Sequence, residues 1–138
     1  MTAQASLRQR YTDADGNTRS PQNLYMNGAA IFHFAITVVP KTIQSLLARL
    51  GLTIDELDLV LFHQANKYML DVLRAKCEIP PERFFVCLRE FGNTVSATIP
   101  IALKNAARQG VLQPHARVLL AGFGVGYSWG AALVRWPG

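Results

Sequence analysis

The sequence has few of the residues that define several large classes of protein. Only two of its 138 residues are cysteine and 17% are charged, while 50% are hydrophobic. A chain this long and this apolar can bury about two thirds of its unfolded surface. The composition therefore excludes a disulfide scaffold, a collagen-like repeat and a disordered tail, and we expect one folded domain of ordinary size.

Long apolar runs and metal-ligand patterns are also lacking. We find no apolar run of the roughly 18 residues that a membrane span needs, and the N-terminus is polar, so the sequence predicts a soluble cytoplasmic protein. Cys77 and Cys87 have neither a C-x2-C spacing nor paired histidines nearby. They are expected to be reduced structural thiols, and no metal site is expected.

Acidic residues are scarce in the second part of the chain. From residue 59 onward nine basic residues stand against four acidic ones. Such a surface suits an acidic or phosphate-bearing partner, or is an ordinary solvated basic face. A nucleic-acid-binding module is a weaker hypothesis, because no recognised motif and no interleaved aromatic residues accompany the charge.

The hydrophobic pattern predicts helices that alternate with strands. Residues 29–50 have helical periodicity interrupted at Pro40, which predicts two helical pieces with a kink or break there. Further helices are expected at about 67–77 and 95–109, strands at 57–62, 84–88, 117–121 and 127–136, and a glycine-rich turn at 122–126. Together they predict a layered α/β fold with a mixed sheet.

Two glycine motifs near the C-terminus resemble known active-site signatures. Residues 126–130 match the G-x-S-x-G nucleophile elbow of hydrolases, but a strand-like segment follows instead of a helix and only eight residues remain. Residues 122–126 have G-x-G-x-G spacing and also precede a strand, unlike a dinucleotide site. Neither motif is expected to carry chemistry here.

Two polar residues stand where open α/β sheets place their ligand sites. His63 follows an apolar strand and precedes a helix, and Asn93 occupies a turn beside Gly92. Together they could donate hydrogen bonds to one developing oxyanion, although a lone histidine is more often structural. His33, in a helix, and His115, in a turn, are expected to be structural or surface residues.

Four blocks of residues occur together in an order and spacing typical of one enzyme family. They are Met26-Asn27-Gly28, Phe62-His63-Gln64-Ala65-Asn66, Phe91-Gly92-Asn93-Thr94, and GVGYSWGA at 124–131 followed by Leu133-Val134-Arg135. These blocks resemble the C-terminal half of β-ketoacyl-acyl-carrier-protein synthase III, of the thiolase-like superfamily. The resemblance implies that residues 24–138 form one αβαβα half of a chain about twice as long. The polar leader at 1–23 is expected to be a loop or a short hairpin, because of the turn residues Asp15-Gly16-Asn17 and Ser20-Pro21.

The resemblance implies a Cys-His-Asn triad and a decarboxylative Claisen condensation of acyl-coenzyme A with malonyl-carrier protein, in fatty acid biosynthesis. His63 falls on the family's catalytic histidine and Asn93 on its catalytic asparagine. A neutral imidazole and an amide would each donate a hydrogen bond to the malonyl thioester oxygen. The nucleophilic cysteine lies in the family's N-terminal half, and neither Cys77 nor Cys87 matches it. The chain alone is therefore expected to be inactive.

The resemblance also implies residues that bind the substrate. Gly28 and Phe32 match residues that line the pantetheine tunnel, and Asn66 matches one near the tunnel mouth. Helix packing is the alternative role for Phe32, and N-capping is the alternative for Asn66. Val125 stands in a loop that usually has three glycines, where an amide helps to bind the acyl-thioester oxygen. A β-branched residue disfavours a positive φ there.

The implied partners are acyl carrier protein and acyl-CoA. Lys67, Arg74 and Lys76 would dock the acidic carrier protein, although Tyr68 stands where the family often has arginine. Coenzyme A thioester and phosphopantetheine are substrates, so no cofactor is expected, and neither nucleic acid nor membrane is an expected partner. An exposed apolar face predicts either the missing N-terminal half or a second copy as a partner. The alternative function is a noncatalytic acyl-CoA-binding or carrier-protein-binding pseudoenzyme subunit of a split complex.

Overall fold

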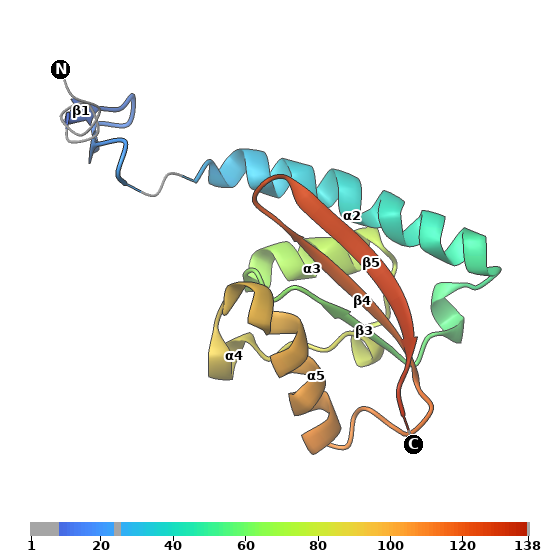
Figure 1. Cartoon of the computed structure of the whole chain (residues 1–138). Helices are drawn as coiled ribbons and strands as arrows, with labels where there is room; N and C mark the ends of the chain where they lie inside the picture. Colours follow the sequence, from blue (N-terminus) through green and yellow to red (C-terminus); the bar gives the residue numbers. More distant parts are fainter. Residues whose placement is uncertain (1–8, 24–25, 138) are drawn as a thin grey trace.

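The computed structural model describes residues 9–23 and 26–137. The described elements, in chain order, are β1 (Tyr11–Thr12), β2 (Thr18–Arg19), α2 (Gly28–Leu50), η1 (Ile54–Glu56), β3 (Leu59–Phe62), α3 (Lys67–Lys76), η2 (Pro81–Arg83), α4 (Leu88–Phe91), η3 (Val95–Ala97), α5 (Thr98–Arg108), β4 (Arg117–Gly124) and β5 (Ser128–Arg135). Figure 1 shows the helices around one small sheet.

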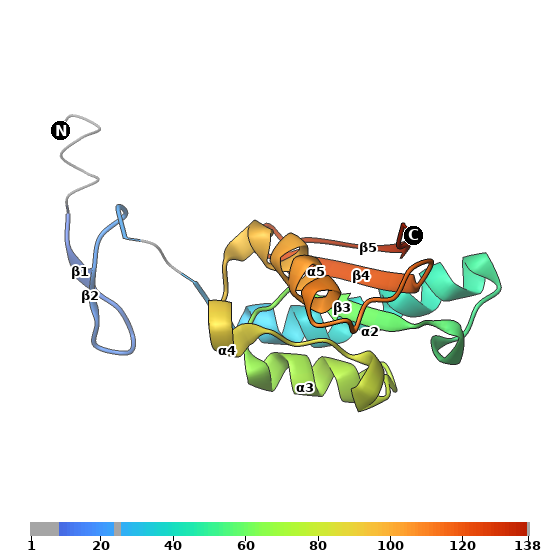
Figure 2. The ribbon, with the colours of Figure 1, turned by 90° about the horizontal axis from the view of Figure 1, so that it is seen from below.

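A two-stranded hairpin of β1 and β2 precedes the sheet and helices, and both views draw it away from them (Figures 1 and 2). The Asp13 carboxylate accepts the amides of Asp15 and Asn17 at 3.0 and 2.8 Å, which closes the turn. The hydrogen bond from the Arg19 side chain is the main cause that lowers the pKa of Asp13 to about 2. Of the loop or short hairpin expected in the polar leader, the structure has the hairpin, while residues 1–8 of that leader lie outside the described residues.

The main sheet has the order β3-β4-β5 and is mixed, as predicted. β3 and β4 are parallel, with Leu59 opposite Val118, and β4 and β5 are antiparallel, with Arg117 opposite Arg135. Two long antiparallel strands need only a short connection, whereas the parallel pair needs the helical crossover between β3 and β4. The carboxyl end of β3 therefore lies beside the later part of β4.

Alternate residues of β3 and β4 supply two separate cores, one on each face of the sheet. Val60 and Phe62 pack with residues of α2 and α3, whereas Leu59 and Leu61 pack with residues of α5. Figure 2 shows α3 and α5 on opposite sides of the sheet. Since side chains alternate along a strand, burial of both faces explains why β3 is apolar at every position.

The break expected at Pro40 is wrong, because α2 continues through it to Leu50 and ends at Gly51, with φ +63°. A proline inside a helix removes one hydrogen bond and costs about 3 kcal/mol. Burial of a large apolar side chain contributes about 1.5–3 kcal/mol, so the packed face of α2 outweighs this cost. The buried residues on that face are Phe34, Ala35, Val39, Ile43 and Leu47.

α2 also corrects the expectation that no apolar segment is long enough to span a membrane. Its 23 residues have a mean hydropathy of 1.4 in the most apolar window, enough by length and composition alone. In the structure this helix packs on α3 and on the sheet. Within that apolar window 22% of the residues are buried, and the buried residues of α2 form its packed face.

One predicted strand is absent, and one predicted strand end is wrong. Residues 84–88 form no strand: Phe84 makes a single parallel bridge with Val60, and the Phe85 amide donates to the Val60 carbonyl at 3.1 Å. β4 extends to Gly124, beyond the glycine-rich turn expected from residue 122. The antiparallel register with β5 pairs Gly122 with Gly130 and so carries the ladder into the glycines.

Candidate functional site

His63 lies immediately after the carboxyl end of β3 and is held there by backbone and ring contacts. Its amide donates to the Ala121 carbonyl of β4 at 2.8 Å, which extends the parallel pairing by one residue. The half-buried imidazole meets the Phe123 ring edge to face, with 5.5 Å between centroids. The parallel sheet therefore positions both the backbone and the ring of His63.

Thr98, the first residue of α5, contacts the ring nitrogen Nδ1 of His63. Its side-chain oxygen lies 2.7 Å from His63 Nδ1, and its hydroxyl donates to the Val95 carbonyl at 3.0 Å. Burial lowers the pKa of His63 below 6.5, and the backbone of Val95 partly opposes this shift. The site thus favours a neutral imidazole near pH 7.

Asn93 lies in the turn between α4 and η3, after Gly92, which has a positive φ of +63°. Its Oδ1 accepts the amide of Val95 at 2.9 Å. Because a backbone N–H must face an acceptor, this contact fixes the orientation of the amide group. Nδ2 is left as the side of Asn93 that donates.

Val95 connects the two predicted site residues. Its N–H is bound by Asn93, while its carbonyl accepts from Thr98, the residue in contact with the His63 ring. Val95 is 72% exposed and has φ +55°, which is a rare conformation for a β-branched residue. Such strain persists where the surroundings fix the backbone, often at functional sites. The structure therefore brings His63 and Asn93 into one hydrogen-bonded unit.

Gln64 is a buried residue of this site that the sequence analysis missed. It is 1% exposed, donates through Nε2 to the Phe62 carbonyl at 2.8 Å, and accepts the Cys87 amide at 3.0 Å. These bonds tie the segment that leads to Asn93 against β3. Its position next to His63, directly after an apolar strand, was the available signal.

An open cavity of about 640 Å³ lies beside Asn93. Asn66 also borders it and caps α3, since its side chain accepts the Met69 amide at 2.9 Å. The N-capping role considered for Asn66 is therefore confirmed. The residues that line the cavity are Ala65, Asn66, Lys67, Val86, Leu88, Arg89, Glu90, Gly92 and Asn93.

The residues expected along a pantetheine tunnel lie on α2. Gly28 is its first residue, and a Cβ there would meet no atom of the described residues within 4 Å, so none of them requires glycine there by close approach. Phe32 stacks on Tyr68 of α3, with ring centroids 5.5 Å apart. Packing between helices, the alternative role for Phe32, is therefore observed.

The conformational constraint expected at Val125 falls on its neighbour. Val125 is 70% exposed and has no positive φ, whereas Gly126 has φ +139° and its added Cβ would lie 2.8 Å from Ser128 Oγ. Ser128 begins β5. Because no helix follows this serine, the G-x-S-x-G match is not a nucleophile elbow.

The three basic residues expected to dock a carrier protein all lie on α3. Lys67 pairs with Asp71 at 2.5 Å one turn later, and Arg74 donates to the Ile79 carbonyl at 2.9 Å. Lys76 borders a separate cavity of about 350 Å³ that also includes Cys77. Local contacts therefore orient two of these positive charges.

The thiols and the remaining histidines have environments unlike that of a nucleophile. Burial raises the pKa of Cys77 to about 12, against a smaller opposing effect of Lys76, and burial also raises the pKa of Cys87. Both thiols are free.

His33 and His115 are exposed, as expected for surface residues. Among residues 9–23 and 26–137, no His, Cys, Asp and Glu side chains cluster in a way that would hold a metal.

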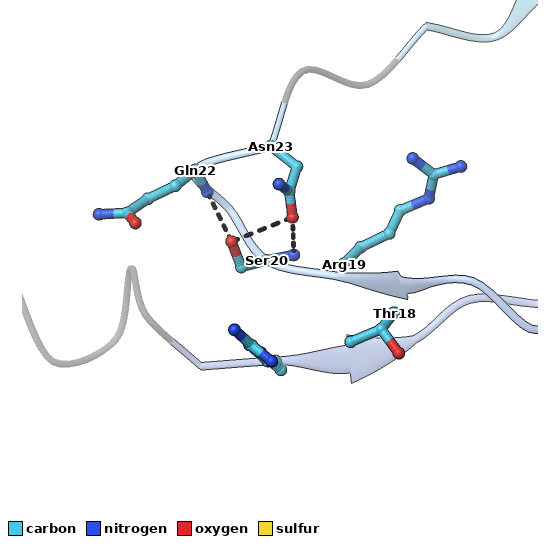
Figure 3. Close-up of a pocket in the computed structure, with 6 residues that line it drawn as sticks. Thr18, Arg19, Ser20, Gln22 and Asn23 are labelled. Carbon is cyan, nitrogen blue, oxygen red and sulfur yellow. Dashed lines mark hydrogen bonds between the residues drawn. The ribbon is translucent and has the colours of Figure 1, made fainter.

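A cavity of about 730 Å³ lies in the N-terminal hairpin rather than near His63. Figure 3 shows its residues, with Ser20, Gln22 and Asn23 bonded to one another in a local turn. Its lining residues are Arg10, Thr18, Arg19, Ser20, Gln22 and Asn23. The Arg19 side chain is already engaged with Asp13.

Comparison with known proteins gives a match over most of the sheet and helices. The family described as 3-Oxoacyl-[acyl-carrier-protein (ACP)] synthase III C terminal matches residues 47–136. The chain belongs to this family. The suspected resemblance is confirmed, and so is the thiolase-like α/β fold of 3-oxoacyl-acyl-carrier-protein synthase III, since one crystal structure of such a synthase superposes with a TM-score of 0.90 at 43% identity.

Curated relatives show how much of such a protein the chain represents. It is 43% identical over 111 residues to a β-ketoacyl-acyl-carrier-protein synthase III of Thermosynechococcus vestitus, and 47% identical over 110 residues to one of Nitratidesulfovibrio vulgaris. Each match covers 80% of this chain but only 34% and 33% of the relative. The superposed crystal structure is covered to 39%, against 96% of this chain. The chain thus spans about a third of its relatives, less than the half expected.

Proposed function

We propose that this chain forms the His- and Asn-bearing part of a β-ketoacyl synthase III-like acyltransferase of fatty acid biosynthesis. The observation that supports this most directly is that His63, at the carboxyl end of β3, is joined to Val95 through Thr98, while Asn93 contacts Val95 directly. Two such groups joined through one residue suit the stabilisation of a single negatively charged oxygen.

The proposed reaction is the decarboxylation of malonyl-carrier protein followed by condensation. Carbon dioxide leaves, and its bonding electron pair moves to the α-carbon and the thioester oxygen. The carbanion then attacks an acyl group held as a thioester on a cysteine, whose thiolate leaves to give a β-ketoacyl-carrier protein. Asn93 would donate through Nδ2, and the His63 ring would stabilise the same oxygen. Loss of one such group costs on the order of 3 kcal/mol in the barrier.

The nucleophilic cysteine would come from an N-terminal part of the enzyme. Neither Cys77 nor Cys87 suits this role, because burial raises the pKa of both thiols. The matched relatives are long enough to contain such a part, since these matches cover 33–34% of their length. We expect the protein to be cytoplasmic. We also expect the chain to associate either with that N-terminal part or with a second copy of itself.

Substrate contacts follow the same proposal. The pantetheine arm would pass Gly28, Phe32 and Asn66, and the Val125 loop would approach the acyl thioester. The acidic carrier protein would dock on α3 through Lys67, Arg74 and Lys76. Coenzyme A and phosphopantetheine enter as parts of substrates, and the proposal needs no cofactor.

A noncatalytic subunit that binds acyl-CoA or carrier protein is the second candidate. It is favoured by one observation, namely that Cys87 is buried, Cys77 is partly buried, and the pKa of each thiol is raised. Under this hypothesis His63 and Asn93 bind thioester without turning it over.

Reconstitution tests the proposal. The chain is mixed with a cysteine-bearing N-terminal part of a relative, acyl-CoA and malonyl-carrier protein, and the β-ketoacyl product is measured. His63→Ala and Asn93→Ala should each lower the rate about 100- to 1,000-fold, whereas His33→Ala, on the exposed surface of α2, should leave it unchanged. A rate indifferent to both site variants overturns the assignment. Binding of acyl-CoA without product from the wild-type mixture favours the noncatalytic subunit.

A further inference from the structure

The contacts of the Thr98 hydroxyl define the protonation of the His63 ring. Thr98 is 2% exposed, and its side-chain oxygen has two neighbours, His63 Nδ1 at 2.7 Å and the Val95 carbonyl oxygen at 3.0 Å. A threonine hydroxyl has one proton to donate and two lone pairs with which to accept. Only one of the two neighbours can therefore receive its proton.

The carbonyl of Val95 decides which neighbour receives it. A carbonyl oxygen has no proton, so the contact with Val95 is a hydrogen bond only when Thr98 donates to it. The contact at Nδ1 is then a hydrogen bond only when the imidazole donates. In the opposite arrangement Thr98 would donate to Nδ1, and the Val95 carbonyl would keep the backbone N–H of Thr98 but would face a hydroxyl oxygen that offers it no proton. Only the directed chain from Nδ1–H to Thr98 and from Thr98 to Val95 makes both contacts of the Thr98 hydroxyl hydrogen bonds.

We propose that Thr98 is a positioning residue that holds the neutral imidazole of His63 in the Nδ1–H tautomer and leaves Nε2 as the acceptor nitrogen. The tautomer is a property of this chain, and only its catalytic consequence rests on the proposed function. A neutral ring in this tautomer does not donate from Nε2, which revises the hydrogen bond expected from a neutral His63.

The consequence for the proposed reaction is an ordered transfer of one proton. The thiol of the N-terminal part's cysteine gives its proton to Nε2: the S–H bond breaks, an N–H bond forms, and the electron pair stays on sulfur as the thiolate. The resulting imidazolium carries protons on both nitrogens. Its Nε2–H can then donate to the thioester oxygen beside Asn93.

Nitrogen NMR of the 138-residue chain tests the tautomer directly. With ¹⁵N-labelled histidine, long-range ¹H–¹⁵N correlations at about pH 8, where the imidazole is neutral, distinguish a protonated from an unprotonated ring nitrogen. The signals of His63 are assigned by their loss in His63→Gln. We expect Nδ1 to be protonated and Nε2 to be unprotonated. A wild-type ring protonated at Nε2 overturns the proposal without any variant.

Three variants test whether Thr98 is the cause. Thr98→Val has nearly the same shape without the hydroxyl, and should reduce the Nδ1–H tautomer from the predominant to the minor form. Thr98→Ser should restore it. Thr94→Val is the matched control, because the Thr94 hydroxyl is buried without a partner and its removal should leave the tautomer unchanged. An unchanged tautomer in folded Thr98→Val overturns the role of Thr98. If reconstituted activity is unchanged in His63→Ala while the wild-type ring has the Nδ1–H tautomer, the proposed function is overturned. The assignment of the tautomer then still stands.

Discussion

Gln64 Oε1 accepts the backbone amide of Cys87 at 3.0 Å, and both residues are buried. The Gln64 amide group donates in turn to the Phe62 carbonyl at 2.8 Å. One side chain therefore joins β3 to a segment that makes only a single bridge with it. The turn that holds Asn93 follows this segment, so Gln64 connects the sheet to the candidate site.

Gln64→Leu should destabilise the chain. Leucine fills a similar volume but leaves the buried Cys87 amide without an acceptor, and an unsatisfied buried group costs about 1–3 kcal/mol. Urea unfolding monitored by circular dichroism measures this free energy. Gln44→Leu, at an exposed position on α2, is the control and should change stability by less than about 0.5 kcal/mol. Equal effects of the two variants would contradict the role assigned to Gln64.

The sequence was sufficient to predict most of the fold, but local pattern failed where distant residues decide the structure. The apolar periodicity located α3, α5 and the strands β3 and β5. It failed at Pro40, because packing of α2 on the sheet outweighs the local cost of proline. It failed again at 84–88, where the β-like residues of that segment are held by Gln64 instead of a ladder.

The residues of the site that were predicted lie in local sequence motifs, whereas the residue that was missed contacts the site from a distant part of the sequence. His63, Asn93 and Asn66 were recognisable because each follows or precedes an element and forms part of a short motif. Thr98 was not, because it meets His63 across 35 positions of sequence. Only the packing of α5 against β3 brings them together, and no local pattern records that contact.

Asn66→Ala should remove the N-cap of α3. The lost hydrogen bond to the Met69 amide should cost about 1 kcal/mol of stability, the usual effect of such a substitution. Asn66→Asp keeps an acceptor at the same position and is expected to retain most of it. Thermal or urea unfolding of the three proteins measures the difference. If alanine and aspartate are equally destabilising, capping is not what Asn66 contributes.

The pH dependence of stability should show the lowered pKa of His63. The unfolded chain takes up a proton on this residue near pH 6.5, whereas burial delays that uptake to lower pH in the folded chain. Unfolding is therefore accompanied by proton uptake in that interval, and stability decreases as the pH falls below 6.5. Asp13, with a pKa lowered from 3.8 to about 2, acts in a separate and more acidic window.

Urea midpoints measured between about pH 7.5 and 5 give this slope. His63→Gln should flatten it, whereas His33→Gln, at an exposed helix position, should leave it unchanged. A wild-type midpoint that rises on acidification through this interval would contradict the burial of the His63 ring.

Both cysteines should react slowly in the folded chain. With a pKa of about 12, only about one Cys77 thiol in 10,000 is ionised at pH 8, and the thiolate is the reactive form. Burial raises the pKa of Cys87 as well. Ellman's reagent at pH 8 should therefore label the native chain far more slowly than the chain in urea. Rapid labelling of one native thiol would identify a reactive cysteine and reopen the question of the nucleophile.

Gly126→Ala should destabilise the β4–β5 turn, whereas Gly124→Ala should not. At Gly126 the φ of +139° is strained for any L-residue, and the new Cβ would lie 2.8 Å from Ser128 Oγ and 3.1 Å from Ser128 N. Backbone strain of this kind costs about 1–3 kcal/mol. At Gly124 a Cβ meets nothing within 4 Å and φ is not positive, so alanine fits the strand. The difference between the two urea midpoints measures the effect of alanine in the turn itself, because both glycines lie within two residues of Val125 and share its surroundings. If the two variants are equally stable, the turn adopts a different conformation in solution.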